Sequence, residues 1–231
     1  MTKRFREPLL DKLERKYRRY APRNLMLFIV ITTLLVWLLE EIIFIQSGKS
    51  VIYTWFHFNR DAILRGEVWR LITFVFLPPE DDILRLALTL YFNWLIGSTV
   101  ELEWGSFRFD VFYLCGVIGA IISGFITGYT FNGYLNASLF LAYGILNPDD
   151  KLLLFFIIPI KAKYLAIYQA ITWLFMFFVS FWVYRIALIM AFLNLILFFY
   201  KDYIRCVKNF FRKRKYKRES KRDETEYPFD L

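Results

Sequence analysis

The stretch from Val111 to Tyr129 contains no charged side chain, and it constrains the fold more than any other part of the sequence. A helix that crosses a bilayer needs about 20 mainly apolar residues, and only a helix satisfies its own backbone polar groups in hydrocarbon. The whole chain is 58% hydrophobic, whereas soluble domains are usually about 45–50% apolar. The sequence therefore predicts a polytopic integral membrane protein that contacts the lipid bilayer.

Six apolar segments are predicted to cross the membrane. The first four are Asn24 to about Ile45, about Ile83 to Val100, Val111 to Tyr129, and about Leu135 to Leu146. The fourth is short, and it stops at the sequence Asn-Pro-Asp-Asp over residues 147–150, which is a strong helix terminator. The tract from Ala162 to Tyr200 is long enough for two helices with a break near residues 180–184. We therefore expect an all-α fold, a bundle of six transmembrane helices.

Basic residues gather at both ends of the chain. Residues 1–23 and 201–231 together hold 20 of the 30 Lys and Arg residues. An even number of spans places both ends on one side, which the positive-inside rule assigns to the cytoplasm. Basic flanks beside an apolar body favour contact with anionic lipid over nucleic acid, so no nucleic-acid partner is predicted.

The same pattern predicts the domain organisation. We expect a basic amphipathic N-terminal segment over residues 1–23, a membrane domain over 24–200 and a basic cytoplasmic tail over 201–231. Compact loops and the absence of a targeting peptide favour the inner (plasma) membrane of a bacterium.

The connection over residues 46–82 is unusual. It is too aromatic for a solvated loop and too charged to span, so we expect an interfacial structure lying partly in the outer leaflet. The segment from Leu152 to Ile160 is apolar but too short to cross, and we place it at the inner face.

The third predicted span is rich in glycine. Small residues at near-helical spacing let two helix backbones approach closely, which favours tight packing in the bundle core. The predicted helix-packing residues are Gly116, Gly119, Gly124 and Gly128. The sequence contains no His/Cys cluster, so neither a metal site nor a cofactor is predicted.

The second predicted span carries a polar stripe. Arg85, Thr89 and Asn93 are spaced four residues apart and therefore share one helix face. Polar groups at membrane depth are costly unless they face the bundle interior or a wet cavity. The stripe is interpreted either as part of a functional cavity or as a polar contact between helices.

Two motifs resemble the rhomboid superfamily, which contains intramembrane serine proteases and their inactive relatives, including the derlins. The first is Gly-Glu-Val-Trp-Arg over residues 66–70, and the second is Glu-Leu-Glu-Trp-Gly-Ser-Phe-Arg over 101–108. The resemblance implies a six-helix fold over about residues 24–200. It also implies that Trp69 and Arg70 brace the first loop and that Glu101 ties helices together, with Gly105 and Arg108 completing the second motif.

The active-site positions depart from the family pattern. Family proteases use a Ser within Gly-x-Ser-Gly on the fourth span and a His on the sixth. Here Ser138 has no neighbouring glycine, and the chain's one histidine, His57, lies in the first loop. Counting along the chain places Arg185 near the expected base, and Arg85 and Thr89 at the expected oxyanion donors. A hydroxyl without a base within reach is a weak nucleophile.

The sequence therefore predicts a rhomboid-like pseudoprotease that recognises transmembrane segments of client proteins. The candidate client-binding residues are Arg85, Thr89 and Asn93. The alternative is an active rhomboid-family intramembrane serine endopeptidase that uses Ser138.

Overall fold

The computed structural model describes residues 8–80, 82–154 and 158–199, and its long helices account for most of them. Within this part, five helices are long and apolar enough to cross a membrane. They are α2 (Leu25–Ser47), α6 (Ile83–Trp104), α7 (Ser106–Thr127), α9 (Ala162–Val179) and a last helix, Trp182–Phe199. A shorter apolar helix, α8 (Gly133–Leu146), is the fourth predicted span. The predicted all-α membrane bundle is therefore confirmed.

The contacts among residues group the chain into two units, Met1–Asn194 and Leu195–Leu231. Of the second unit, residues 195–199 are described, and they complete the last helix. The predicted cytoplasmic tail, residues 201–231, lies outside the described residues, so the three-part organisation stays a prediction.

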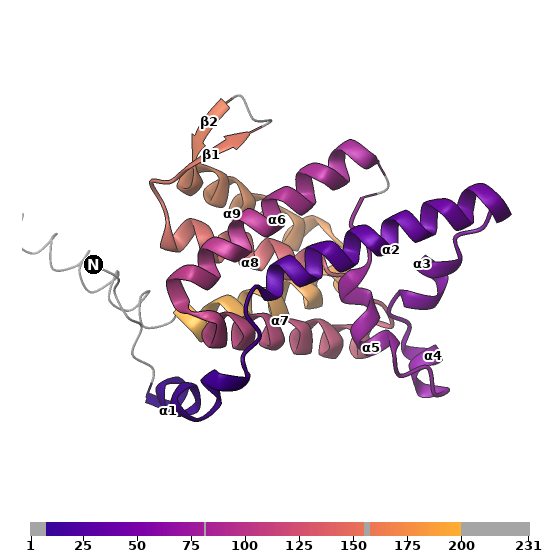
Figure 1. The fold of residues 1–231 in the computed structure, drawn as a ribbon, viewed down its shortest axis with the longest axis horizontal. Coiled ribbons are helices and arrows are strands. Elements are labelled where there is room, and N and C mark those ends of the chain that lie inside the picture. Colours follow the sequence, from indigo (N-terminus) through magenta and orange to yellow (C-terminus); the bar gives the residue numbers. More distant parts are fainter. Residues whose placement is uncertain (1–7, 81, 155–157, 200–231) are drawn as a thin grey trace, which may run out of the picture. The chain divides into compact units, whose positions relative to one another are not determined.

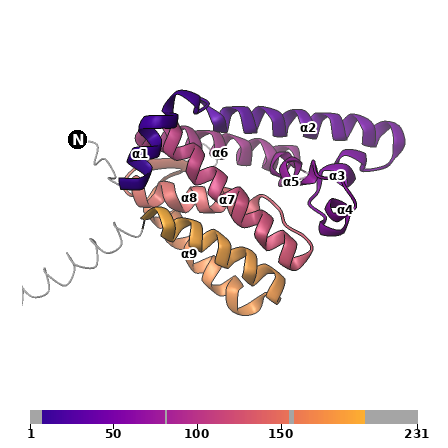
Figure 2. The ribbon, with the colours of Figure 1, turned by 90° about the horizontal axis from the view of Figure 1, so that it is seen from below.

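The helices of the first unit pack in a continuous series. In this series α2 contacts α6, α6 contacts α8 and α8 contacts α9, while α7 lies against both α6 and α8 (Figures 1 and 2). Two close approaches hold the series together. A Cβ at Gly97 of α6 would overlap the side chain of Met26 of α2, and a Cβ at Gly144 of α8 would overlap that of Ala166 of α9.

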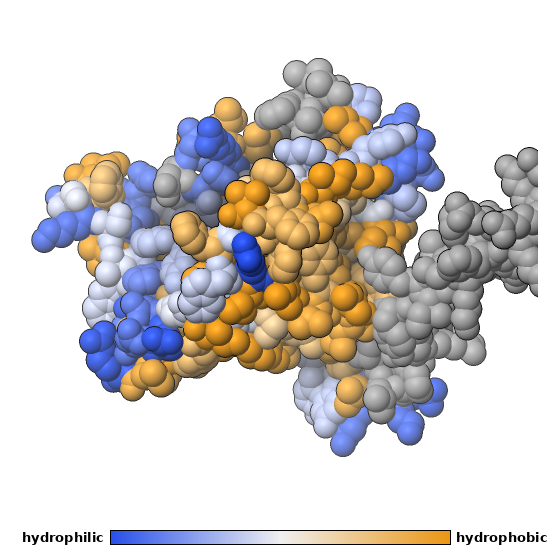
Figure 3. Space-filling view, turned by 180° about the vertical axis from the view of Figure 1, so that it is seen from behind, coloured by the Kyte–Doolittle hydropathy of each residue, from blue (hydrophilic) through white to orange (hydrophobic). Residues whose placement is uncertain are grey.

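Large apolar side chains remain exposed on the outer faces of the helices. Phe178, for example, is 70% exposed. One face of the molecule carries a broad apolar area with hydrophilic residues gathered at its margins (Figure 3). Large exposed apolar surfaces mark contacts with membranes or with other proteins, and this one supports the assignment to a lipid bilayer.

The first loop folds into short helices beside the C-terminal half of α2 (Figure 1). These are α3 (Val51–Phe56), α4 (Arg60–Leu64), α5 (Arg70–Thr73) and a 3-10 turn, η2 (Phe74–Phe76). At the other end of the first span, the amphipathic N-terminal segment forms α1 (Pro8–Tyr17), followed by the 3-10 turn η1 (Arg18–Tyr20).

One segment departs from the all-α prediction. The apolar stretch after α8 forms an antiparallel hairpin of β1 (Lys151–Leu154) and β2 (Ile158–Lys161), with Leu153 paired to Pro159. The stretch is too short to span, and a proline has no amide hydrogen for a helix interior or a central strand but is tolerated in a two-stranded edge. The Asp149 carboxylate forms ion pairs with Nζ of Lys161 at 3.3 Å and Nζ of Lys163 at 3.0 Å. These hydrogen bonds lower the pKa of the Asp149 carboxyl, with Lys163 the larger cause.

Candidate functional site

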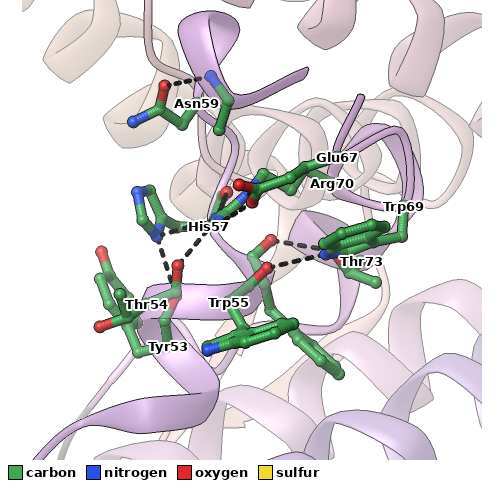
Figure 4. A network of polar contacts seen from close by, with 11 residues as sticks. Tyr53, Thr54, Trp55, His57, Asn59, Glu67, Trp69, Arg70 and Thr73 are labelled. Carbon is green, nitrogen blue, oxygen red and sulfur yellow. Dashed lines mark hydrogen bonds and ion pairs between the residues drawn. The ribbon is translucent and has the colours of Figure 1, made fainter. Parts of the chain in front are cut away.

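Arg70 is the centre of a polar network in the first loop (Figure 4). Its side chain is 8% exposed, and its Nε and Nη2 both lie 2.6 Å from Oε2 of Glu67. Its Nη1 donates to the backbone oxygens of Thr54 at 2.8 Å and His57 at 2.9 Å. One guanidinium therefore donates hydrogen bonds to backbone carbonyl groups at the C-terminal end of α3 and joins this end to α5.

Trp69 adds a second connection between the same two segments. Its indole stacks on that of Trp55 with ring centroids 6.1 Å apart, and its Nε1 donates to the backbone oxygen of Trp55 at 3.3 Å (Figure 4). The hydroxyl of Thr73 donates to the backbone oxygen of Phe56 at 3.0 Å. The Trp-Arg pair of the first motif thus lies where it holds the loop together.

Glu101 performs a similar role at the opposite end of α6. It is 8% exposed, and its Oε1 accepts from the backbone nitrogen of Asn24 and from the hydroxyl of Ser106, each at 2.8 Å. It therefore links the start of α2 with the α6–α7 turn. Gly105 has φ of 83° in this turn, a backbone conformation that favours glycine. Arg108 pairs with Glu14 of α1 at 2.9 Å.

The glycines of α7 differ in their surroundings. A Cβ at Gly116 would overlap the end of the Leu135 side chain of α8, and one at Gly124 would overlap the ring of Phe58 in the first loop, so neighbouring side chains approach α7 closely at both positions. A Cβ at Gly119 would meet Met190 at an ordinary 3.6 Å. Gly128 has no atom within 4 Å of such a Cβ; it ends α7 with φ of 89°, so its backbone conformation, and not helix packing, favours glycine there.

Ser138 lies inside the bundle on α8 and is 1% exposed. Its hydroxyl donates to the backbone oxygen of Leu135 in its own helix at 2.7 Å. A cavity of about 20 Å³ lies beside it, and the last helix lines this cavity with Ala187, Met190, Ala191 and Asn194. Among the described residues that line it, none carries an imidazole, carboxylate or amine.

Counting along the chain places Arg185 near the expected base. The residues of the last helix that line the cavity beside Ser138 are Ala187, Met190, Ala191 and Asn194. Arg185 is exposed and donates to the backbone oxygens of Ser180 at 3.0 Å and Phe178 at 3.1 Å. It thus satisfies carbonyl groups at the end of α9, which have no partner within that helix.

His57 lies in the first loop and lines a different cavity from the one beside Ser138. Its Nδ1 is 3.0 Å from the backbone oxygen of Tyr53, and its ring stacks on that of Tyr53 with centroids 5.8 Å apart. Its contacts in the described structure are therefore those of the loop network.

The polar stripe of α6 divides between two environments. Arg85 is exposed, whereas Thr89 and Asn93 are half-buried. Asn93 lines a cavity of about 10 Å³ together with Asn132 and Asn136. Asn93 therefore lies with the other two asparagines at an internal cavity, whereas the Arg85 side chain is exposed on the outside of the bundle.

Asn132 is a structural residue that the sequence analysis missed. It is buried, and its Nδ2 donates to the backbone oxygens of Val75 at 3.0 Å and Leu77 at 2.8 Å. It thereby joins the start of α8 to the end of the first loop. The sequence did show a polar residue between two apolar spans. It could not show the partners of this residue, because the two carbonyl groups lie more than 50 residues earlier in the chain.

Comparison with known proteins identifies the family. A model of the Rhomboid domain matches residues 65–201, which is more than half of the 231 residues. A search of curated proteins found no match. The matched region includes the Trp-Arg pair, the Glu101 turn and the helices from α6 onward. The chain therefore belongs to the rhomboid family.

Proposed function

We propose that this rhomboid-family membrane protein is a pseudoprotease that binds transmembrane segments of client proteins. The observation that carries the proposal is the environment of Ser138. Its hydroxyl donates to its own helix, and the described residues beside it offer no general base. An asparagine such as Asn194 has no basic nitrogen with which to accept the hydroxyl proton.

The chemistry of acyl transfer explains why this matters. A serine hydroxyl attacks a peptide carbonyl only when a base within hydrogen-bond reach takes its proton. Loss of a single member of a catalytic set typically costs about 10⁴-fold or more in rate. The environment of Ser138 therefore supports a protein that has the family fold but lacks a base to take the proton of the serine hydroxyl.

The stripe on α6 supports a binding role. Arg85 is exposed in the first turn of α6, and Thr89, one turn further along the same face, is half-buried. A polar position of a client helix is less costly in the bilayer when it meets polar side chains. The short α8 favours a locally thinned membrane, which eases entry of such a helix.

We also propose the orientation. The basic N-terminal segment and the basic tail lie in the cytoplasm, and the first loop lies on the outer side. The host membrane that suits this arrangement is the inner membrane of a bacterium.

A photo-crosslinking amino acid tests the binding surface. Placed at Arg85 or Thr89 of the full chain in cells, it is expected to give several times more protein adducts than at Ile83. Ile83 is the control for Arg85 because it is 65% exposed, lies two residues away at nearly the same depth, and faces the other side of α6. Equal protein adducts at all three positions, or lipid adducts alone at Arg85 and Thr89, would contradict client binding at the stripe.

A further inference from the structure

A larger cavity lies between the C-terminal half of α2, the first loop and the segment that joins α7 to α8. Its volume is about 570 Å³, which is within the usual range of about 300–1,000 Å³ for small-ligand sites. Two carboxylates, Glu40 and Glu41, line it. Its aromatic lining consists of Trp37, Phe44, Tyr53, Phe74, Tyr129 and Phe131.

The charges in this cavity are unbalanced. No Lys or Arg is among its described lining residues, and in the described part of the chain neither Glu40 nor Glu41 forms an ion pair. Arg70 approaches the cavity residue His57 but is itself paired with Glu67. None of the described residues that line the cavity therefore carries a fixed positive charge to offset the two glutamates.

Two polar atoms in the wall of the cavity lack a partner. Oε2 of Glu40 accepts from the backbone nitrogen of Ile52 at 2.8 Å, but its buried Oε1 has no hydrogen-bond partner within the described structure. The buried Nε1 of Trp37 also has none there. Because these residues are three positions apart on α2, they share one helix face. Both atoms are fully buried, so the Glu40 carboxylate acts on the cavity from within its wall.

The aromatic residues suit the same kind of ligand. The faces of Trp and Tyr rings attract ammonium groups, and the attraction strengthens when water is excluded. Burial and a hydrogen bond with Tyr53 raise the pKa of Tyr129, so its phenol stays protonated and neutral. The negative charge in the wall therefore comes from the two glutamates.

We propose that this cavity binds an organic ammonium group, carried by a phospholipid headgroup or by a free small amine. The ammonium lies against the aromatic rings and is attracted by the negative charge of Glu40 and Glu41. None of the stripe residues Arg85, Thr89 and Asn93 lines the cavity, and neither does Ser138, so the inference is independent of the proposed function.

Calorimetric titration of the full-length protein in phosphatidylglycerol nanodiscs tests the site. Choline is compared with its neutral isostere 3,3-dimethylbutan-1-ol, and choline is expected to bind about tenfold more tightly because charge and cation–π attraction distinguish them. Glu40→Gln keeps an oxygen for the Ile52 nitrogen and is expected to remove this preference. Glu103→Gln, the same change at an exposed glutamate outside the cavity, is expected to keep it.

Glu41→Gln provides a second variant, which removes the other carboxylate that lines the cavity. It is expected to weaken the binding of choline more than that of the neutral isostere. This comparison decides the matter if Glu40→Gln does not fold.

The source of the ligand is distinguished by the lipid. If a headgroup is the occupant, adding phosphatidylethanolamine to the nanodiscs is expected to weaken choline binding by competition; unchanged binding identifies a free amine. Equal affinities for choline and the neutral isostere, no binding of choline in phosphatidylglycerol nanodiscs, or an unchanged preference in both Glu40→Gln and Glu41→Gln would overturn the proposal.

Discussion

Replacing Arg70 by alanine is expected to lower the free energy of unfolding by about 3 kcal/mol, because the loop loses its central charge-assisted hydrogen bonds. The guanidinium is nearly buried, and it bonds Glu67 and the backbone oxygens of Thr54 and His57. Without it the two carbonyls have no donor from this side chain. Glu67 is 34% exposed and regains water in part, which places the cost at the lower end of values for buried pairs. Unfolding in mixed detergent–dodecyl sulfate micelles, followed by circular dichroism, measures the change.

Arg65→Ala is the matched control for this substitution. Arg65 lies in the same loop and is exposed, so its removal is expected to change the free energy of unfolding by no more than about 0.5 kcal/mol. Equal effects of the two substitutions would show that the Arg70 contacts contribute nothing particular to the loop.

Replacing Gly144 by alanine is the second large effect, with an expected loss of about 1–3 kcal/mol from overpacking. The added Cβ would overlap Cβ of Ala166 and lie 3.4 Å from the backbone oxygen of Ala162. Neither atom belongs to a flexible side chain, so relief requires that α8 and α9 move apart. The same unfolding titration measures it.

Gly119→Ala serves as the comparison, since it is also a helical glycine in the membrane domain. A Cβ there meets Cβ of Met190 at 3.6 Å, which is ordinary contact. Alanine is a better helix former than glycine by about 1 kcal/mol in water, so this variant is expected to be at least as stable as the parent. A loss at Gly119 equal to that at Gly144 would mean that close helix approach is not the cause.

The sequence predicted the membrane helices well because their signal is local. The predicted starts near Asn24, Ile83 and Ala162 lie within one residue of the observed helices. The prediction began the third span at Val111, whereas helix α7 begins at Ser106. The residues between these two positions include the charged Arg108 and Asp110, which a hydropathy criterion excludes from a span. The hairpin at residues 151–161 was not predicted, since an apolar stretch does not reveal which partner strand it will meet.

The sites were harder to predict because their contacts join distant segments. The motif residues Trp69, Arg70 and Glu101 were found through a resemblance, whereas their partners, such as Asn24, are set by the fold. Glu40 lines a cavity that depends on residues up to 92 positions later, so no local pattern reveals it. Gly144 lacked a repeating small-residue pattern, so its contact with Ala166 was not expected.

Ser138 provides the most direct test of the account. The purified full-length protein in detergent is treated with a fluorophosphonate probe and, separately, with a model transmembrane substrate, beside a Ser138→Ala variant and an active rhomboid-family protease. The account predicts that the parent and the variant show the same background labelling and no cleavage above the substrate alone. Labelling or cleavage by the parent that disappears in the Ser138→Ala variant would contradict it.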